Sequence, residues 1–166
     1  MTFAVPSVLA LLLPLTLAPI ADPVDTADTA RAASLQQRVD AVLAEFPGGE
    51  QIGPNAISWE DGAIVLELAD SSISARAIST CATGSYCAWP LANYGGNKLS
   101  FTTCTSGGTI DVSLGALGGA AKSLANARGS GTVTVLNVLN STVYSVPAGV
   151  GVPNYGLAAS KLRCFS

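Results

Sequence analysis

The chain has 166 residues and a formal net charge of −3 at pH 7, and 49% of its residues are hydrophobic, which allows one domain of ordinary size with short appendages. It contains no histidine, so Ser-His-Asp and Cys-His catalytic arrangements are excluded and the commonest metal ligand is missing. We therefore expect a protein that is not an enzyme and that uses no cofactor.

Charge is distributed unevenly along the chain. Residues 22–70 hold ten acidic residues against Arg31 and Arg38, whereas residues 71–166 hold six basic residues against Asp111. The acidic part could dock on a basic domain, or the basic part could meet an anionic polymer such as cell wall, although solvated surface charge explains the same pattern. The basic residues are scattered, so nucleic acid is not an expected partner.

The first 21 residues contain no charge and read as a signal peptide with cleavage near Ala21, although the basic segment that usually precedes such a core is missing. An uncleaved N-terminal anchor is the alternative. We expect a secreted, extracellular protein.

The next segments are a linker and a helix. Residues 22–33 are small and polar without a hydrophobic period, which predicts a flexible, disordered linker. From Ser34 the S-x-x-Q capping pattern begins a helix, and Pro47 with two glycines ends it. One face of this helix is apolar, at Leu35, Val39, Val42, Leu43 and Phe46.

Two short runs follow the helix, over 51–59 and 63–69, and the Asp61-Gly62 pair between them predicts a β-hairpin. Helix and hairpin would form an extension over 34–70. A further hypothesis is that this extension is a removable prosegment. Residues 71–80 are rich in Ser and Ala and predict a second linker.

All four cysteines lie after residue 80, which is typical of an oxidising compartment. They allow three pairings. Gly84 could turn the chain between Cys81 and Cys87, and Cys104 with Cys164 would then close a long loop. A zinc site is the weaker interpretation, because only one pair is closely spaced.

Short strand candidates recur in the last domain, over 81–166, separated by Gly, Asn and Ser. They lie at 86–89, 98–102, 131–139 and 142–146. Regular short strands of this kind predict a mainly β, two-sheet sandwich.

The most specific local pattern is Trp89-Pro-Leu-Ala-Asn-Tyr94-Gly-Gly96, in which the second aromatic would pack over a turn and the last glycine would adopt positive φ. The stretch GSYCAWPLANYGGNKLSFTTC resembles secreted bacterial proteins of the metalloproteinase-inhibitor family. The weaker likeness of AKSLANARGSGTVTVLN and of the helix and hairpin extends it over 34–166. The resemblance implies a βγ-crystallin Greek-key fold.

A second copy of the motif is degenerate, with Tyr144 at its start and Gly149 where an aromatic is expected. Crystallin-type calcium sites need oxygen ligands, but the matching segments here are Gly-Gly-Ala-Ala-Lys-Ser at 118–123 and Leu-Ala-Ala-Ser at 157–160. We therefore expect that the calcium site of the fold is lost.

The resemblance implies a protease-inhibitor-like module whose partner is an extracellular protease, in particular a metalloprotease. The short second disulfide that closes the reactive segment in known inhibitors of this fold has no counterpart here. The loops 137–142 and 146–155 are the remaining candidates for binding, and the candidate binding residues are Asn137, Asn140, Tyr144 and Tyr155. The alternative is a monomeric envelope-binding, glycan-binding or antimicrobial module that uses exposed Trp89 and Tyr94.

Overall fold

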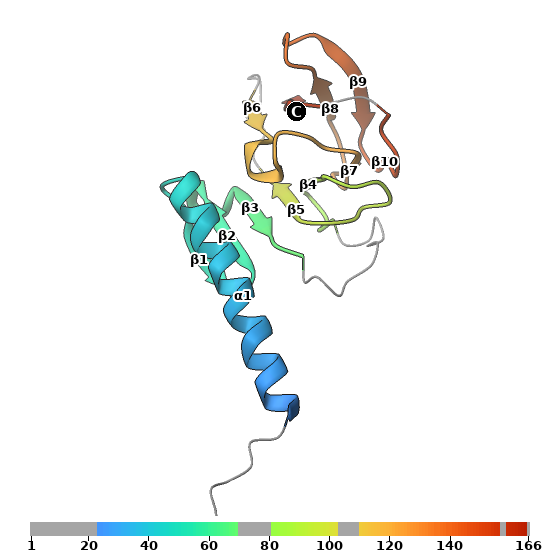
Figure 1. Cartoon of the computed structure of the whole chain (residues 1–166). Helices are drawn as coiled ribbons and strands as arrows, with labels where there is room; N and C mark the ends of the chain where they lie inside the picture. The colour runs from blue at the N-terminus through green and yellow to red at the C-terminus, as the bar shows by residue number, and fades with distance from the viewer. Residues whose placement is uncertain (1–22, 70–80, 103–109, 157–158, 166) are drawn as a thin grey trace, which may run out of the picture.

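The computed structural model describes residues 23–69, 81–102, 110–156 and 159–165 (Figure 1). The expected signal peptide and the expected linker at 71–80 lie outside the described residues. Within these described residues, one α-helix precedes two antiparallel sheets. The predicted mainly β, two-sheet architecture is confirmed.

The larger sheet has seven strands in the order β1-β2-β3-β5-β4-β7-β10, and the smaller sheet has four in the order β6-β11-β8-β9. Their bounds are β1 Glu50–Gly53, β2 Ala56–Trp59, β3 Ile64–Glu67, β4 Tyr86–Trp89, β5 Lys98–Phe101, β6 Ile110–Ser113, β7 Ser123–Asn126, β8 Thr132–Leu136, β9 Thr142–Pro147, β10 Gly151–Val152 and β11 Lys161–Phe165.

The sandwich consists of two halves of four strands, β4 to β7 and β8 to β11, and each half contributes one strand to the sheet of the other. In the first half, β4, β5 and β7 lie in the larger sheet, whereas β6 pairs with β11 in the smaller one. In the second half, β8, β9 and β11 lie in the smaller sheet, whereas β10 pairs with β7 in the larger one. This reciprocal exchange of the third strand is compatible with the expected pair of Greek keys.

The sheets share one hydrophobic core. Its largest fully buried members on the sandwich include Tyr86, Phe101, Leu99, Leu124 and Val135. The β4 and β7 side chains are buried along the whole of each strand, as expected for central strands covered on both faces.

Helix α1 spans Pro23–Glu45, so the prediction of a flexible linker over 22–33 is wrong for its described part, and the helix does not begin at Ser34. Pro23 occupies the first helical position, where its missing N–H costs nothing. The segment that follows is rich in alanine, the strongest helix former. A hydrophobic period is therefore not needed for this part of the helix to form.

The predicted apolar face of the helix packs on the core. Val39 is fully buried, and Leu35, Val42 and Leu43 pack against the same cluster. The helix ends one residue before Phe46, and Gly48 then adopts a φ of 86°.

The predicted hairpin forms between β2 and β3, with Glu60–Gly62 as a 3-10 turn, η1. The run 51–59 is divided into β1 and β2 by a tight turn. Strand β3 joins the hairpin to the sandwich, because it pairs along its whole length with β5 (Figure 1). The extension therefore adds three strands to the larger sheet and shares its core.

The predicted strand at 131–139 ends at Leu136, because Asn137 begins a turn. Sequence reasoning did not predict β6, β7, β10 or β11.

Candidate functional site

The segment from Trp89 to Gly96 folds back on itself at the end of β4. The rings of Trp89 and Tyr94 meet edge to face with centroids 5.1 Å apart, and Leu91 pairs with Gly95 in an isolated bridge. Gly96 has a φ of 83°, and a Cβ added there would lie 3.0 Å from Cγ of Pro90. The turn therefore needs glycine both for its backbone conformation and for its close approach to Pro90.

Ser123 on β7 holds this folded segment through two hydrogen bonds, and we call this pair of contacts the Ser123 brace. Its hydroxyl donates to the carbonyl of Leu91 at 2.7 Å and accepts from the backbone N–H of Tyr94 at 2.9 Å. The Ser123 side chain is fully buried, and its hydroxyl has both hydrogen bonds that such a buried group needs. Sequence reasoning considered Ser123 only as a calcium-site position and missed this role.

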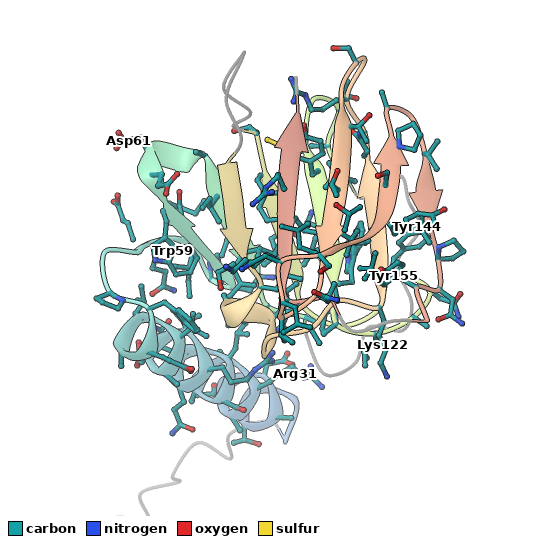
Figure 2. All side chains as sticks on the ribbon, turned by 90° about the horizontal axis from the view of Figure 1, so that it is seen from above. Arg31, Trp59, Asp61, Lys122, Tyr144 and Tyr155 are labelled. Carbon is teal, nitrogen blue, oxygen red and sulfur yellow. A yellow bond between two sulfur atoms is a disulfide. The ribbon has the colours of Figure 1, made fainter. Side chains whose placement is uncertain are left out.

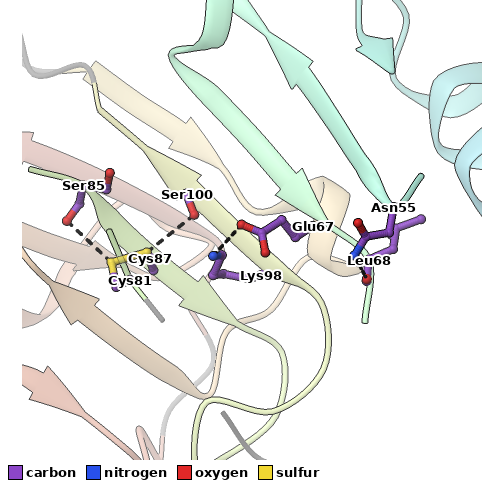
Figure 3. A network of polar contacts seen from close by, with 8 residues as sticks. All are labelled: Asn55, Glu67, Leu68, Cys81, Ser85, Cys87, Lys98 and Ser100. Carbon is purple, nitrogen blue, oxygen red and sulfur yellow. Dashed lines mark hydrogen bonds and ion pairs between the residues drawn. A yellow bond between two sulfur atoms is a disulfide. The ribbon is translucent and has the colours of Figure 1, made fainter. Parts of the chain in front are cut away.

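The Cys81–Cys87 disulfide is present, with the two Cα atoms 5.7 Å apart, which confirms the predicted pairing. Figure 3 shows it beside Ser85 and Ser100. Cys164 is also disulfide-bonded, whereas Cys104 lies outside the described residues. The first disulfide anchors the chain just before β4 and the folded segment.

Asn137 organises the connection between β8 and β9. Its Oδ1 accepts from the backbone N–H of Leu139 at 2.9 Å and of Ser141 at 3.0 Å. The backbone N–H of Asn137 donates to the carbonyl of Ser141, and the backbone carbonyl of Asn137 accepts from the backbone N–H of Asn140. Asn140 has a φ of 58°, a left-handed conformation that asparagine tolerates better than most residues.

This β8–β9 loop, defined as residues 137–141, presents two apolar side chains. Val138 is 80% exposed and Leu139 is 78% exposed, more than the other large hydrophobic residues that the structure describes. The loop is also tied to β11, because Nζ of Lys161 donates to Oδ1 of Asn140 at 3.0 Å. The structure therefore brings Asn137 and Asn140 together as supports, whereas the exposed residues between them were not singled out from the sequence.

Tyr144 and Tyr155 lie side by side (Figure 2). Their rings meet edge to face with centroids 5.5 Å apart. Tyr144 is exposed but Tyr155 is buried, and burial, followed by the nearby Tyr144, raises the pKa of Tyr155. Its backbone N–H donates to the carbonyl of Lys122. Tyr155 thus supports Tyr144 instead of presenting its own surface.

The second, degenerate motif is braced by Asn126, which sequence reasoning also missed. Its buried amide donates to the carbonyls of Val146 at 3.1 Å and Gly131 at 3.3 Å. Its backbone carbonyl accepts from Gly149, which has a φ of 76°. Gly149 therefore forms part of the turn, and the ring of Tyr144 meets Tyr155 edge to face instead of packing over the turn.

An envelope-binding face built on exposed Trp89 and Tyr94 is contradicted. Trp89 is fully buried, and Tyr94 packs against it. Two of the basic side chains also make contacts within the fold. Lys98 pairs with Glu67, and Arg128 donates to the hydroxyl of Tyr86.

Within the described residues there is no group of three or more His, Cys, Asp or Glu side chains placed to hold a metal ion. Over the same residues, no helix is long and apolar enough to cross a membrane.

Residues 74–142 match the model of peptidase inhibitor family I36. This segment contains the disulfide, the folded segment with its Ser123 brace, and the β8–β9 loop. Searches among curated proteins and solved structures found no match.

Proposed function

We propose that this chain, which carries a peptidase inhibitor family I36 segment over residues 74–142, is secreted and inhibits an extracellular metalloprotease. The observation that carries the inhibitor function is that match, which covers the braced folded segment and the β8–β9 loop. It agrees with the resemblance found in the sequence around Trp89 to Gly96. Such a protein acts by binding, not by catalysis.

The β8–β9 loop is the proposed protease contact. A segment that inserts into a protease cleft must keep its shape in solution, since ordering it on binding would cost affinity. Asn137 fixes the loop internally, because two backbone N–H groups of the loop donate to its Oδ1, and Lys161 on β11 fixes the loop to that strand. Val138 and Leu139 point to a protease with an apolar specificity pocket, because they are the side chains that this rigid loop leaves exposed.

The test is a titration of the purified protein into a thermolysin-type metalloprotease, with residual peptide hydrolysis as the measurement. A serine protease and a cysteine protease serve as parallel targets. We expect stoichiometric inhibition of the metalloprotease. Absence of inhibition of all three enzymes at micromolar excess would reject the proposed function, and inhibition of another class alone would reject the metalloprotease target.

The loop is tested with the double variant Val138→Ser/Leu139→Ser. Truncation of a central apolar contact commonly costs 1–2 kcal/mol or more, so the inhibition constant should rise at least about tenfold. The matched control is Ile52→Ser, which removes another exposed apolar side chain, 56% exposed, from β1. If both variants inhibit like the unaltered protein, the loop is not the contact.

A further inference from the structure

A cleft of about 580 Å³ lies where the N-terminal extension meets the sandwich. One side is formed by the end of α1, by Trp59 and by η1. The other side is formed by Leu99 on β5 and by the segment from Ser113 to Ala116. The cleft therefore exists only because the extension is docked on the larger sheet, and its volume is in the range of small-molecule sites.

The walls of the cleft are largely apolar, and a hydrogen bond holds one of their side chains. Phe46, Trp59, Ile64 and Leu99 line it. Trp59 is held by the hydrogen bond from its Nε1 to the carbonyl of Phe46, at 3.2 Å. Figure 2 shows Trp59 between the helix and the sheet. Gly49 leaves room for this indole, since a Cβ there would lie 2.7 Å from it.

The charged side chains that line the cleft are acidic. Glu45 and Glu60 both belong to its lining, and neither Lys nor Arg occurs among the described residues that line it. Glu45 is also the last residue of α1, whose final turn has no basic residue. The carbonyl end of a helix carries partial negative charge, which adds to that of the two carboxylates.

We propose that this cleft binds a small organic cation with an apolar body, such as an arylalkylammonium. The body would lie against Phe46, Trp59 and Ile64, and the cationic group would meet Glu45 and Glu60. Aromatic side chains add attraction for a cation near their faces. The site is separate from the β8–β9 loop, and the proposal does not depend on protease inhibition.

The probe is 4-phenylbutylammonium, compared with 4-phenylbutanol and 4-phenylbutyrate, which keep the same apolar body. Binding is measured by calorimetry and by the chemical shift of the Trp59 indole N–H, with the buried Trp89 indole as the internal reference. We expect a dissociation constant of about 1 mM or below for the cation. The alcohol should bind at least about fivefold more weakly, and the carboxylate more weakly still.

The carboxylates are tested in the variant Glu45→Gln/Glu60→Gln, with Glu50→Gln as the control, because Glu50 is exposed and does not line the cleft. The double variant should weaken binding of the cation about tenfold without changing binding of the alcohol. Melting curves establish that each variant is folded. The proposal is overturned if the cation fails to shift the Trp59 signal at 10 times the expected constant, if the alcohol binds equally well, or if the double variant binds like the control.

Discussion

Glu67 and Lys98 face each other across β3 and β5, with Oε1 and Nζ 2.5 Å apart (Figure 3). The Lys98 side chain is only 8% exposed, and that of Glu67 is 32% exposed. One residue comes from the acidic extension and the other from the more basic part of the chain. This ion pair therefore joins the acidic extension to the more basic part of the chain, which is the kind of contact that the charge asymmetry suggested.

Replacing Glu67 with Gln should destabilise the fold by about 1–3 kcal/mol, because Lys98 would lose an ionic partner in a nearly buried position. The partial exposure of Glu67 keeps the expected loss below that of a fully buried pair. Chemical denaturation measures it. Asp28→Asn is the control, since Asp28 and Arg31 form an exposed pair within α1, and its loss should stay below about 0.5 kcal/mol. Equal effects of the two substitutions would contradict the importance of burial.

Elements with a complete local pattern were predicted from the sequence. The β2–β3 hairpin has a turn signal between two apolar runs, and the apolar face of α1 has a helical period. Strand β7 was missed because its residues, Ser-Leu-Ala-Asn, include no β-branched or aromatic residue. Strand β10 has only two residues and depends on its pairing with β7.

The candidate site was predictable only in part, because some of its contacts join residues that are far apart in the sequence. The spacing of Trp89, Tyr94 and Gly96 is local, so the folded segment could be inferred. The brace from Ser123 joins residues 32 positions apart, and no local pattern reports such a contact. The sequence placed Val138 and Leu139 both at the end of a strand and in a candidate loop, because the turn begins with the side chain of Asn137 and not with Gly or Pro.

Asn137→Ala should loosen the β8–β9 loop without unfolding the protein. The substitution removes the acceptor for two backbone N–H groups at an exposed site, where water can replace it, so the stability loss should be about 1 kcal/mol or less. Under the proposed function, inhibition should weaken about five- to tenfold because the loop must be ordered on binding. Inhibition and melting are measured together. Unchanged inhibition would separate loop rigidity from function.

Ser123→Ala should cost about 2–3 kcal/mol, because it leaves the carbonyl of Leu91 and the N–H of Tyr94 without their buried partner. The expected signature is a lower denaturation midpoint with an unchanged slope. Ser145→Ala, at an exposed position on β9, should change stability by less than about 0.5 kcal/mol. A loss at Ser123 no larger than that at Ser145 would mean that the folded segment does not need its brace.

Gly96→Ala tests the close approach within the folded segment. Gly118 has a similar positive φ, 77° against 83°, but a Cβ there would meet nothing within 4 Å. Both substitutions should cost about 1 kcal/mol for the left-handed conformation. Gly96→Ala should cost about 1–2 kcal/mol more, because its Cβ would press on Pro90. The difference between their unfolding free energies isolates this contact, and equal losses would show that Pro90 moves aside freely.

Tyr155→Phe should have little effect near neutral pH but a growing effect in alkali. The Tyr155 hydroxyl is buried and makes no hydrogen bond with the residues that the structure describes, so its removal at pH 7 should change stability by no more than about 0.5 kcal/mol. Burial raises the pKa of the folded-state tyrosine above that of the unfolded chain. The folded state therefore retains a proton that the unfolded state loses above about pH 10, and the free energy of unfolding falls as pH rises through that range.

The phenylalanine variant lacks this ionisation, so its stability should fall less steeply than that of the unaltered protein above about pH 10. Denaturation at a series of pH values from 7 to 11 measures the difference. The pKa of Tyr94 is raised by burial as well, so Tyr94→Phe should also reduce the fall in stability at alkaline pH. Parallel pH profiles for the unaltered protein and Tyr155→Phe would show that the hydroxyl is solvated when folded, and a large loss at pH 7 would show that it has a hydrogen-bond partner.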